Sequence, residues 1–338
     1  MKRGIILGKF LPPHAGHVAL IRSARKLVDE LTVLLCVTDA DPIPGPIRRD
    51  WLRTLFPDCR IAYHDAPAPR HPGETSDFGK HWSAIVRAAH PEPIDTVFAG
   101  DEAGAELARH LAAFFVPLGG RVLGADQAGL GGLPSSAIRA DWWAHWRWLP
   151  EPVRDHYALT ISLHGVESTG KSTLAEQLAL HYSTVVVPEY GRAHCEVHGT
   201  DCREEDLLLI GLAQQAEIEA ARPWCNRLLV TDTDALMTAA WSQMMIGYVP
   251  DQLVCHRKAD LYLVLAPDLP FVDDATRVYR EAGERDRFDR IARDVLKMTK
   301  CNVVEVAGAG ESRFEAAVAA IDALVARRRA GGLEIYST

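Results

Sequence analysis

The stretch ALTISLHGVESTGKSTLAEQLALHY, residues Ala158 to Tyr182, decides the fold of the second half of the chain. It opens with an apolar run typical of a buried strand and closes with residues that favour a helix. Between the two, Gly165 to Ser172 follow the pattern G-x-x-x-x-G-K-S, in the strand-then-helix context that this pattern requires. Glycines let backbone N–H groups converge on phosphate oxygens, and the start of a helix adds partial positive charge. Because every fixed residue type is present, we expect a phosphate-binding loop (P-loop) rather than an ordinary turn.

The P-loop predicts a site for ATP and Mg²⁺. Lys171 is expected to reach the β- and γ-phosphates, and the Ser172 hydroxyl to bind Mg²⁺. Asp232 ends the apolar run LLVTD, at the sheet edge where ligands bind, and is expected to be the acidic metal ligand. Asp234 is expected to face the substrate, although a role as the cap of the next helix is an equal alternative. The nucleotide-binding residues predicted here are Gly165, Glu167, Ser168, Thr169, Gly170, Lys171, Ser172 and Thr173.

A carboxylate ends the next predicted strand, in the stretch TVVVPEYGR. Glu189 would lie beside the P-loop and is expected to accept the proton of an attacking hydroxyl group. Tyr190 and Arg192 follow it directly, and both are expected to bind the substrate.

An arginine-rich stretch follows further on, DDATRVYREAGERDRF, residues 273–288. Such a segment suits a lid that closes over a transferred phosphoryl group, with Arg285 and Arg287 on the nucleotide. A solvent-exposed charged helix is the alternative for each arginine.

Strands alternate with helices in both halves of the chain. In the second half we expect strands at 158–165, 184–189, 227–234, 260–267 and 302–308, and a last helix at 314–326. In the first half we expect strands at 4–8, 31–37, 60–64, 95–100 and 114–118, with helices at 18–28 and 47–56. A further helix is expected to carry Trp142, Trp143, Trp146 and Trp148. Strand–helix–strand units imply parallel sheets, and Pro150 and Pro152 mark a boundary. We therefore expect an α/β protein of two parallel-sheet domains, at residues 1–152 and 153–338.

The first predicted strand ends in GKFLPPHAGH, residues Gly8 to His17, which is a second candidate site. His14 and His17 would lie at the positive start of a helix, beside a glycine turn, which suits the phosphates of a nucleotide. The spacing H-x-x-H also suits a metal ion, but zinc sites need three or four ligands and the sequence offers no third nearby.

GKFLPPHAGH resembles the signature of the HxGH nucleotidyltransferases, whose two histidines stabilise charge on ATP phosphates during adenylyl transfer. The second signature of that family resembles LPSSAIR, residues 133–139. The likeness implies a Rossmann-like first domain in which His14, His17 and Arg139 are catalytic. It also implies nucleotide contacts at Gly8, Lys9, Phe10 and Ser136. Pro134 departs from the pattern, because a serine is usual there.

The order of the two domains, over about residues 3–325, resembles the bifunctional nicotinamide-mononucleotide adenylyltransferase/ribosylnicotinamide kinases. The likeness implies a P-loop kinase domain that phosphorylates nicotinamide riboside to the mononucleotide, NMN, which the first domain then adenylylates to NAD. It implies substrate contacts at Phe271, Asp273 and Asp274, with Phe271 in place of a tryptophan that stacks on nicotinamide. Some members begin with a helix-turn-helix repressor domain, and we expect none here because the first predicted strand starts within six residues.

Charge and cysteine content limit the classes of partner. A net charge of −8 without a long basic run argues against nucleic acid as the main ligand. Seven cysteines spread singly are typical of reduced thiols in a cytosolic protein, and neither a leader peptide nor an apolar run of membrane-spanning length is visible. We expect a soluble cytoplasmic enzyme whose partners are nicotinamide riboside, NMN and ATP, without nucleic acid or membrane; association of identical copies is left open.

Two alternatives remain at this point. Pro134 leaves room for a ribosylnicotinamide kinase whose adenylyltransferase domain is degenerate. A nucleotide-sensing regulatory protein, with two ligand pockets and slow turnover, would carry the same motifs.

Overall fold

The computed structural model describes the chain except for residues 70–73, 76, 101, 119–134, 272–280 and 333–338. The chain forms two compact units, residues 1–154 together with 331–332, and residues 155–330. The boundary between them lies within helix α6 (Glu151–Tyr157). Each unit contains one five-stranded parallel sheet with helices, so the prediction of two parallel-sheet α/β domains is confirmed.

The first unit is built on a sheet of strand order β3-β2-β1-β4-β5. Its strands are β1 (Arg3–Gly8), β2 (Glu30–Cys36), β3 (Arg60–His64), β4 (Thr96–Ala99) and β5 (Phe114–Pro117), and all pair in parallel. Because β1 lies between β2 and β4, the direction in which strands are added reverses at β1. Ligands of such sheets bind beyond the carboxyl ends of the strands at this reversal. β1 ends at Gly8, so the histidine-containing turn starts at that place.

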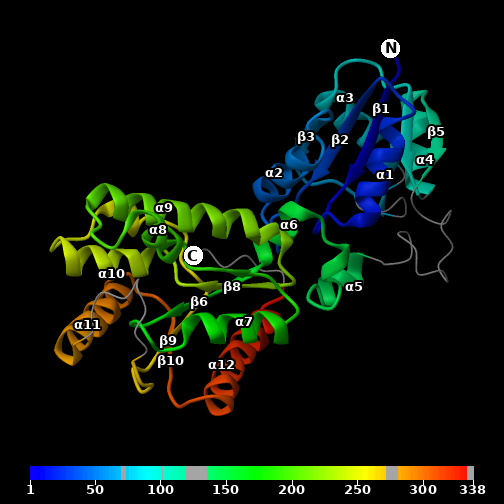
Figure 1. Cartoon of the computed structure of the whole chain (residues 1–338). Helices are drawn as coiled ribbons and strands as arrows, with labels where there is room; N and C mark the ends of the chain where they lie inside the picture. Colours follow the sequence, from blue (N-terminus) through cyan, green and yellow to red (C-terminus); the bar gives the residue numbers. More distant parts are fainter. Residues whose placement is uncertain (70–73, 76, 101, 119–134, 272–280, 333–338) are drawn as a thin grey trace. The chain divides into compact units, whose positions relative to one another are not determined.

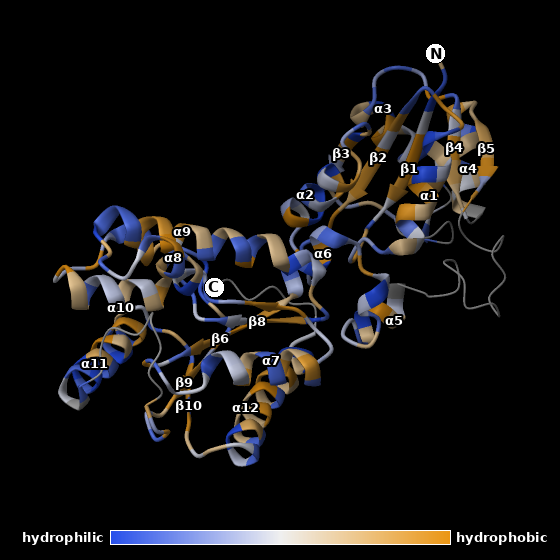
Figure 2. Cartoon of the chain, viewed as in Figure 1, coloured by the Kyte–Doolittle hydropathy of each residue, from blue (hydrophilic) through white to orange (hydrophobic). Residues whose placement is uncertain are grey.

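Helices cover both faces of the first sheet. They are α1 (Ala15–Arg25), α2 (Gly45–Leu55), α3 (Phe78–Ala89) and α4 (Glu102–Leu111), followed by the short α5 (Ser135–Ala140). Neighbouring strand residues point to opposite faces. Ile6 accordingly packs with Ile21 and Leu52 of α1 and α2, whereas Ile5 packs with Val86 of α3. The middles of the central strands β1 and β2 are hydrophobic (Figure 2).

The second unit has a sheet of order β10-β9-β6-β8-β7. Its strands are β6 (Leu159–His164), β7 (Val186–Val187), β8 (Leu228–Asp232), β9 (Leu261–Leu265) and β10 (Val303–Val306), again all parallel. β6 lies between β8 and β9, so this sheet also reverses at its first strand. The predicted P-loop follows β6 at that point.

In the described part of the second unit, six helices flank the sheet. They are α7 (Lys171–His181), α8 (Tyr190–His198), α9 (Glu204–Ala221), α10 (Ala235–Met245), α11 (Ala282–Met298) and α12 (Glu311–Ala330). In Figure 1, α7 and α12 lie along one face of the sheet, and α9 and α10 lie along the other. A core of buried residues, among them Leu236, Tyr262 and Phe288, joins α10 and α11 to the strands. Within the described residues, none of the helices has the length and apolar character needed to cross a membrane.

Two predicted elements differ from the structure. The tryptophan-rich segment does not form one helix, because the Asp141 carboxylate accepts a hydrogen bond from the Ala144 amide (3.0 Å) and stabilises a turn instead. Only Trp146–Trp148 form a helical turn, the 3₁₀ turn η2. Strand β7 has two residues rather than six, since Pro188, which has no N–H group, follows it directly.

Arg222, in the 3₁₀ turn η3 (Arg222–Trp224), binds the segment with which the second unit begins. Its side chain is buried and donates to the Asp155 carboxylate (3.1 Å), to the carbonyls of Asp155 (2.6 Å) and Ala158 (2.9 Å), and to the Thr160 hydroxyl. A planar guanidinium with five N–H groups can make all of these bonds at once. The end of α9 is thereby tied to the start of β6.

Replacement of Arg222 by Met is expected to destabilise the second unit by about 3 kcal/mol, because buried carbonyl groups would lose their donors at a cost of about 1–3 kcal/mol each. Hydrogen–deuterium exchange of the β6 and β8 amides measures this loss directly. Arg327→Met, at an exposed position of α12, is the matched control. Equal protection of β6 and β8 in the two variants would contradict the assigned role.

Candidate active site

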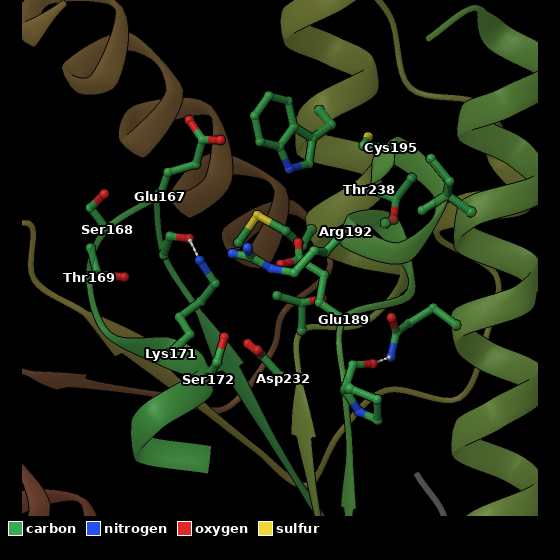
Figure 3. A pocket seen from close by; sticks show the side chains of 18 of the residues that line it. Glu167, Ser168, Thr169, Lys171, Ser172, Glu189, Arg192, Cys195, Asp232 and Thr238 are labelled. Atoms are coloured by element: carbon green, nitrogen blue, oxygen red, sulfur yellow. Dashed lines mark hydrogen bonds between the residues drawn. The ribbon is translucent and has the colours of Figure 1, made fainter. Parts of the chain in front are cut away.

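A cavity of about 520 Å³ lies at the carboxyl ends of β6, β7 and β8 in the second unit (Figure 3). The loop between β6 and α7 forms one wall, and residues of α8, α9 and α10 form others. This cavity brings together most of the site residues predicted for the second unit. Those that line it are Gly165, Glu167, Ser168, Thr169, Gly170, Lys171, Ser172, Thr173, Glu189, Arg192 and Asp232.

Two glycines are required by the shape of the P-loop. Gly170 precedes α7 with a φ of 82°, in the left-handed region. Gly165 has a φ of 137°, and a Cβ atom there would lie 2.9 Å from the carbonyl oxygen of Leu265. Side chains are disfavoured at both positions, so the pattern seen in the sequence follows from the backbone.

Lys171 folds back over the loop that it follows. Its Nζ donates to the carbonyls of Gly165 (2.9 Å) and Val166 (3.1 Å). The ammonium group therefore lies within the loop, at the place where phosphate oxygens would meet it.

The oxygen atoms of Ser172 and Asp232 suit a magnesium ion. Asp232 is 3% exposed, and its Oδ1 atom is buried without a hydrogen bond from any described residue. Mg²⁺ prefers oxygen ligands, and proteins usually hold it with one or two side chains together with substrate phosphates. The described residues contain no cluster of three His, Cys, Asp or Glu side chains placed to hold a metal. The donor set thus fits Mg²⁺ bound jointly with a nucleotide.

Glu189 lies at the start of α8 and lines the same cavity as Lys171 and Asp232 (Figure 3). Burial raises the pKa of its carboxyl group. The positive charges of Lys171 and Arg192 lower this pKa, and the negative charges of Asp232 and Glu167 raise it. A carboxylate with a raised pKa is a stronger base than one in water, so the position suits proton acceptance.

Asp234 lies elsewhere. One carboxylate oxygen accepts the Leu236 amide (3.0 Å) and so caps α10, and the other accepts the Tyr262 hydroxyl (2.5 Å). Asp234 lines a different, much smaller cavity. Of its two expected roles, the structure shows the helix cap. Tyr190 is also outside the large cavity, and its ring lies near that of His194.

The predicted lid is described only in part. Arg285 donates to the Glu167 carbonyl (3.2 Å) and so contacts the P-loop. Its guanidinium also lies 5.2 Å from the centre of the Phe271 ring, which therefore packs against Arg285 rather than lining the cavity. Arg287 is exposed on α11. Asp273 and Asp274 lie outside the described residues.

Two buried side chains of this site could not be predicted from a sequence motif. Arg313 of α12 donates to the Thr169 carbonyl of the P-loop and to the carbonyls of Gly308 (2.7 Å) and Ala266 (3.2 Å). Gln214 of α9 lines the cavity and contacts the main chain on both sides of Glu189. Neither residue lies in a recognisable motif, because their partners are distant in the sequence.

The first unit places His14 and His17 at the start of α1. The Nδ1 atom of His14 accepts the Gly16 amide (3.2 Å), and that of His17 accepts the His14 amide (3.3 Å). The two imidazoles thus cap the helix reciprocally, with ring centres 3.8 Å apart. Since both Nδ1 atoms accept, each neutral ring carries its proton on Nε2.

Both histidines are neutral at physiological pH. Burial lowers the pKa of His14 to about 4, with a smaller effect from the positive charge of Arg139. Burial also lowers the pKa of His17 to about 3, assisted by His14. Arg139 of α5 thus lies close enough to act on His14, which places this residue of the second signature near the first. Ser136 of the same helix is exposed.

Lys9 is held by a partly buried ion-pair network that the sequence did not reveal. Its Nζ lies 3.2 Å from the Asp41 carboxylate, which also accepts from Arg48 (2.8 Å) and from the amide and hydroxyl of Thr38. Arg48 is fully buried and donates to the Lys9 carbonyl (2.6 Å). Burial tends to raise the pKa of Asp41, but these hydrogen bonds outweigh it and lower the pKa to about 2.

The turn that carries Lys9 is shaped by its neighbours. Phe10 is 2% exposed and has a φ of 48°, and the centres of its ring and the His17 ring lie 4.9 Å apart in an edge-to-face arrangement. A Cβ atom at Gly8 would lie 3.0 Å from the Phe10 ring, a tight contact that favours glycine at the end of β1.

Comparison with known proteins gives three results. The family profile described as an AAA domain matches residues 160–313, within the second unit. The chain is similar to the "Trifunctional NAD biosynthesis/regulator protein NadR" of Salmonella typhimurium, with 26% identity over 327 residues, 90% of this chain and 78% of that protein. The protein of the same description from Escherichia coli has 26% identity over 329 residues, with the same coverage.

Among solved structures, the chain is similar to a NadR protein in complex with NR, with a TM-score of 0.70, 20% identity and 96% of each chain covered. It is also similar to a NadR protein in complex with NAD and AMP-PNP, with a TM-score of 0.69, 20% identity, and 100% of this chain and 98% of that chain covered. This chain therefore shares the fold of the NadR structures over nearly its whole length.

Proposed function

We propose that this chain makes NAD from nicotinamide riboside in two ATP-dependent steps. The second unit transfers the γ-phosphoryl group of ATP to the 5′-hydroxyl of the riboside, which gives NMN and ADP. The first unit joins NMN to the adenylyl group of a second ATP, which gives NAD and pyrophosphate. The similarity to proteins named for NAD biosynthesis, and to NadR structures with NR, NAD and AMP-PNP, supports this choice of substrates.

The observation that carries the kinase step is the meeting of Lys171, Asp232 and Glu189 in one cavity. The 5′-hydroxyl attacks the γ-phosphorus, the bond to the β-phosphate oxygen breaks, and Glu189 takes the hydroxyl proton. Lys171 holds the charge that develops on the phosphate oxygens. Mg²⁺, held by Ser172 and Asp232 when bound, neutralises phosphate charge.

The adenylyl step uses the end of β1 and the start of α1. A phosphate oxygen of NMN attacks the α-phosphorus of ATP, and pyrophosphate leaves, so no covalent intermediate with the chain is needed. His14 and His17 donate hydrogen bonds from Nε2, and Lys9 and Arg139 supply positive charge. The structural support is the proximity of Arg139 to His14 and the fixed orientation of both imidazoles.

Lys171→Ala is expected to abolish most riboside phosphorylation and to leave adenylylation of supplied NMN within about twofold of the wild type. Loss of a preorganised charge donor typically costs about 10²–10³ in rate. Both activities are measured on the full chain by separating NMN, NAD and ADP, with the exposed Lys297→Ala as control. Parallel loss of both activities in a folded variant would contradict two separate sites.

His17→Ala is expected to give the converse result, a large fall in adenylylation with kinase turnover unchanged. The exposed His81→Ala of α3 is the matched control. Loss of a stoichiometric bound metal from the His17 variant would instead support a metal at H-x-x-H. A wild-type chain that makes NMN but no NAD would reduce the proposal to the kinase step, and one that turns over neither substrate would favour a nucleotide sensor.

The rate of riboside phosphorylation is expected to fall with acidification through the pKa of Glu189, because only the ionised carboxylate accepts a proton. Burial raises this pKa above the ordinary value of 4.5, so the acid limb of kcat/KM lies above pH 4.5. Glu189→Gln should lower kcat by at least about tenfold and remove this limb. Asp234→Asn should retain this acid limb. If Glu189→Gln is fully active and Asp234→Asn is inactive, the base is Asp234 instead.

A further inference from the structure

Gln214 makes two main-chain contacts around the proposed base. Its side-chain oxygen accepts the amide of Tyr190 (2.7 Å), and its side-chain nitrogen donates to the carbonyl of Pro188 (3.1 Å). Pro188 and Tyr190 are the residues immediately before and after Glu189. Gln214 comes from α9, is 2% exposed and lines the same cavity. One amide group thus fixes the backbone on both sides of Glu189.

The contact to Tyr190 supplies a partner for the first amide of α8. Glu189 occupies the N-cap position of α8, where a side-chain oxygen commonly accepts one of the unpaired amides of the first turn. In the described structure Glu189 makes no such capping bond. Gln214 instead accepts the Tyr190 amide from outside the helix, and Glu189 lines the cavity.

The burial of Gln214 makes this arrangement stiff. A buried amide side chain that left its polar atoms unpaired would cost free energy, so both bonds are strongly favoured together. The peptide groups flanking Glu189 are therefore held in one orientation, which limits where its side chain can point. Catalytic groups need such support, because a displacement of about 1 Å can cost about 10²-fold in rate.

We propose that Gln214 is a positioning residue for Glu189: by holding the main chain on both sides of Glu189, it aims the Glu189 carboxylate at the attacking hydroxyl group. This inference rests on the proposed kinase function. Gln214 acts through Glu189 and not on the substrate, so its contribution exists only while Glu189 can act as a base.

A double-mutant cycle tests this dependence. The variants are Gln214→Met, Glu189→Gln and the double variant, with kcat and KM for nicotinamide riboside measured on the full chain. Gln214→Met should lower kcat by about tenfold or more and change the KM for ATP by less than about twofold. In the Glu189→Gln background the same replacement should have no further effect, since residues that act as a unit are not additive. Equal losses in both backgrounds would overturn the proposal.

Two further variants separate positioning from a general effect on folding. Gln215→Met is the matched control, because Gln215 is also buried on α9 but donates to Glu219 instead of to the Glu189 segment. It should keep wild-type kcat at a similar melting temperature. Gln214→Glu retains an acceptor for the Tyr190 amide and should recover part of the activity lost in Gln214→Met. Similar loss of kcat in Gln215→Met and Gln214→Met would point to α9 packing and overturn the proposal.

The wild-type assay separates this inference from the function on which it rests. A wild-type chain that does not phosphorylate the riboside removes the proposed kinase function, and the inference with it. A wild-type chain that does so, with an additive cycle, removes the inference alone.

Discussion

The cavity of the second unit depends on the hydrogen bonds that the buried guanidinium of Arg313 donates. It bonds to carbonyl groups of three segments: Thr169 in the P-loop, Ala266 after β9, and Gly308 before α12. It also pairs with Asp268. An arginine stays charged at all relevant pH values and offers five donors in one plane, so it can hold several carbonyls together. The loop is thereby shaped before a nucleotide arrives, and less binding free energy is lost in ordering it.

A buried arginine also holds the candidate site of the first unit, from helix α2. Arg48 is fully buried, donates to the Lys9 carbonyl and pairs with Asp41. Asp41 in turn holds the Lys9 ammonium, so one network fixes both the main chain and the side chain at the end of β1. Both candidate sites are therefore loops after a central strand, and each is held by a buried arginine from a helix outside its motif.

Local features of the sequence were sufficient to predict the sheets and the P-loop. Apolar runs bounded by glycine or proline marked the strands, because parallel strands buried on both faces read as continuous hydrophobic stretches. The motif G-x-x-x-x-G-K-S carries its own backbone requirement, so it was visible without any knowledge of the fold. Asp234 was ambiguous for a physical reason: the same carboxylate can cap a helix or face a ligand, and the Tyr262 hydroxyl that decides between them is 28 residues away.

The supporting residues could not be predicted in this way. Gln214 bonds to a residue 24 positions earlier, and Arg313 to one 144 positions earlier, so neither partner is visible in a local pattern. The tryptophan-rich segment shows the reverse case, in which a local turn at Asp141 prevailed over helical spacing. Long-range hydrogen bonds thus support the site, although local motifs mark its position.

The reciprocal histidine caps of α1 also link the stability of the first unit to proton uptake. An unfolded imidazole has a pKa of 6.5, whereas the folded values are about 4 for His14 and about 3 for His17. Between these limits the unfolded chain binds protons that the folded unit excludes, so stability falls progressively as the pH drops below about 6.5. Below the folded values, the protonated rings would lose their acceptor atoms and repel each other at a helix end that already disfavours cations. Acid lability of this unit would therefore originate in the groups that build its site.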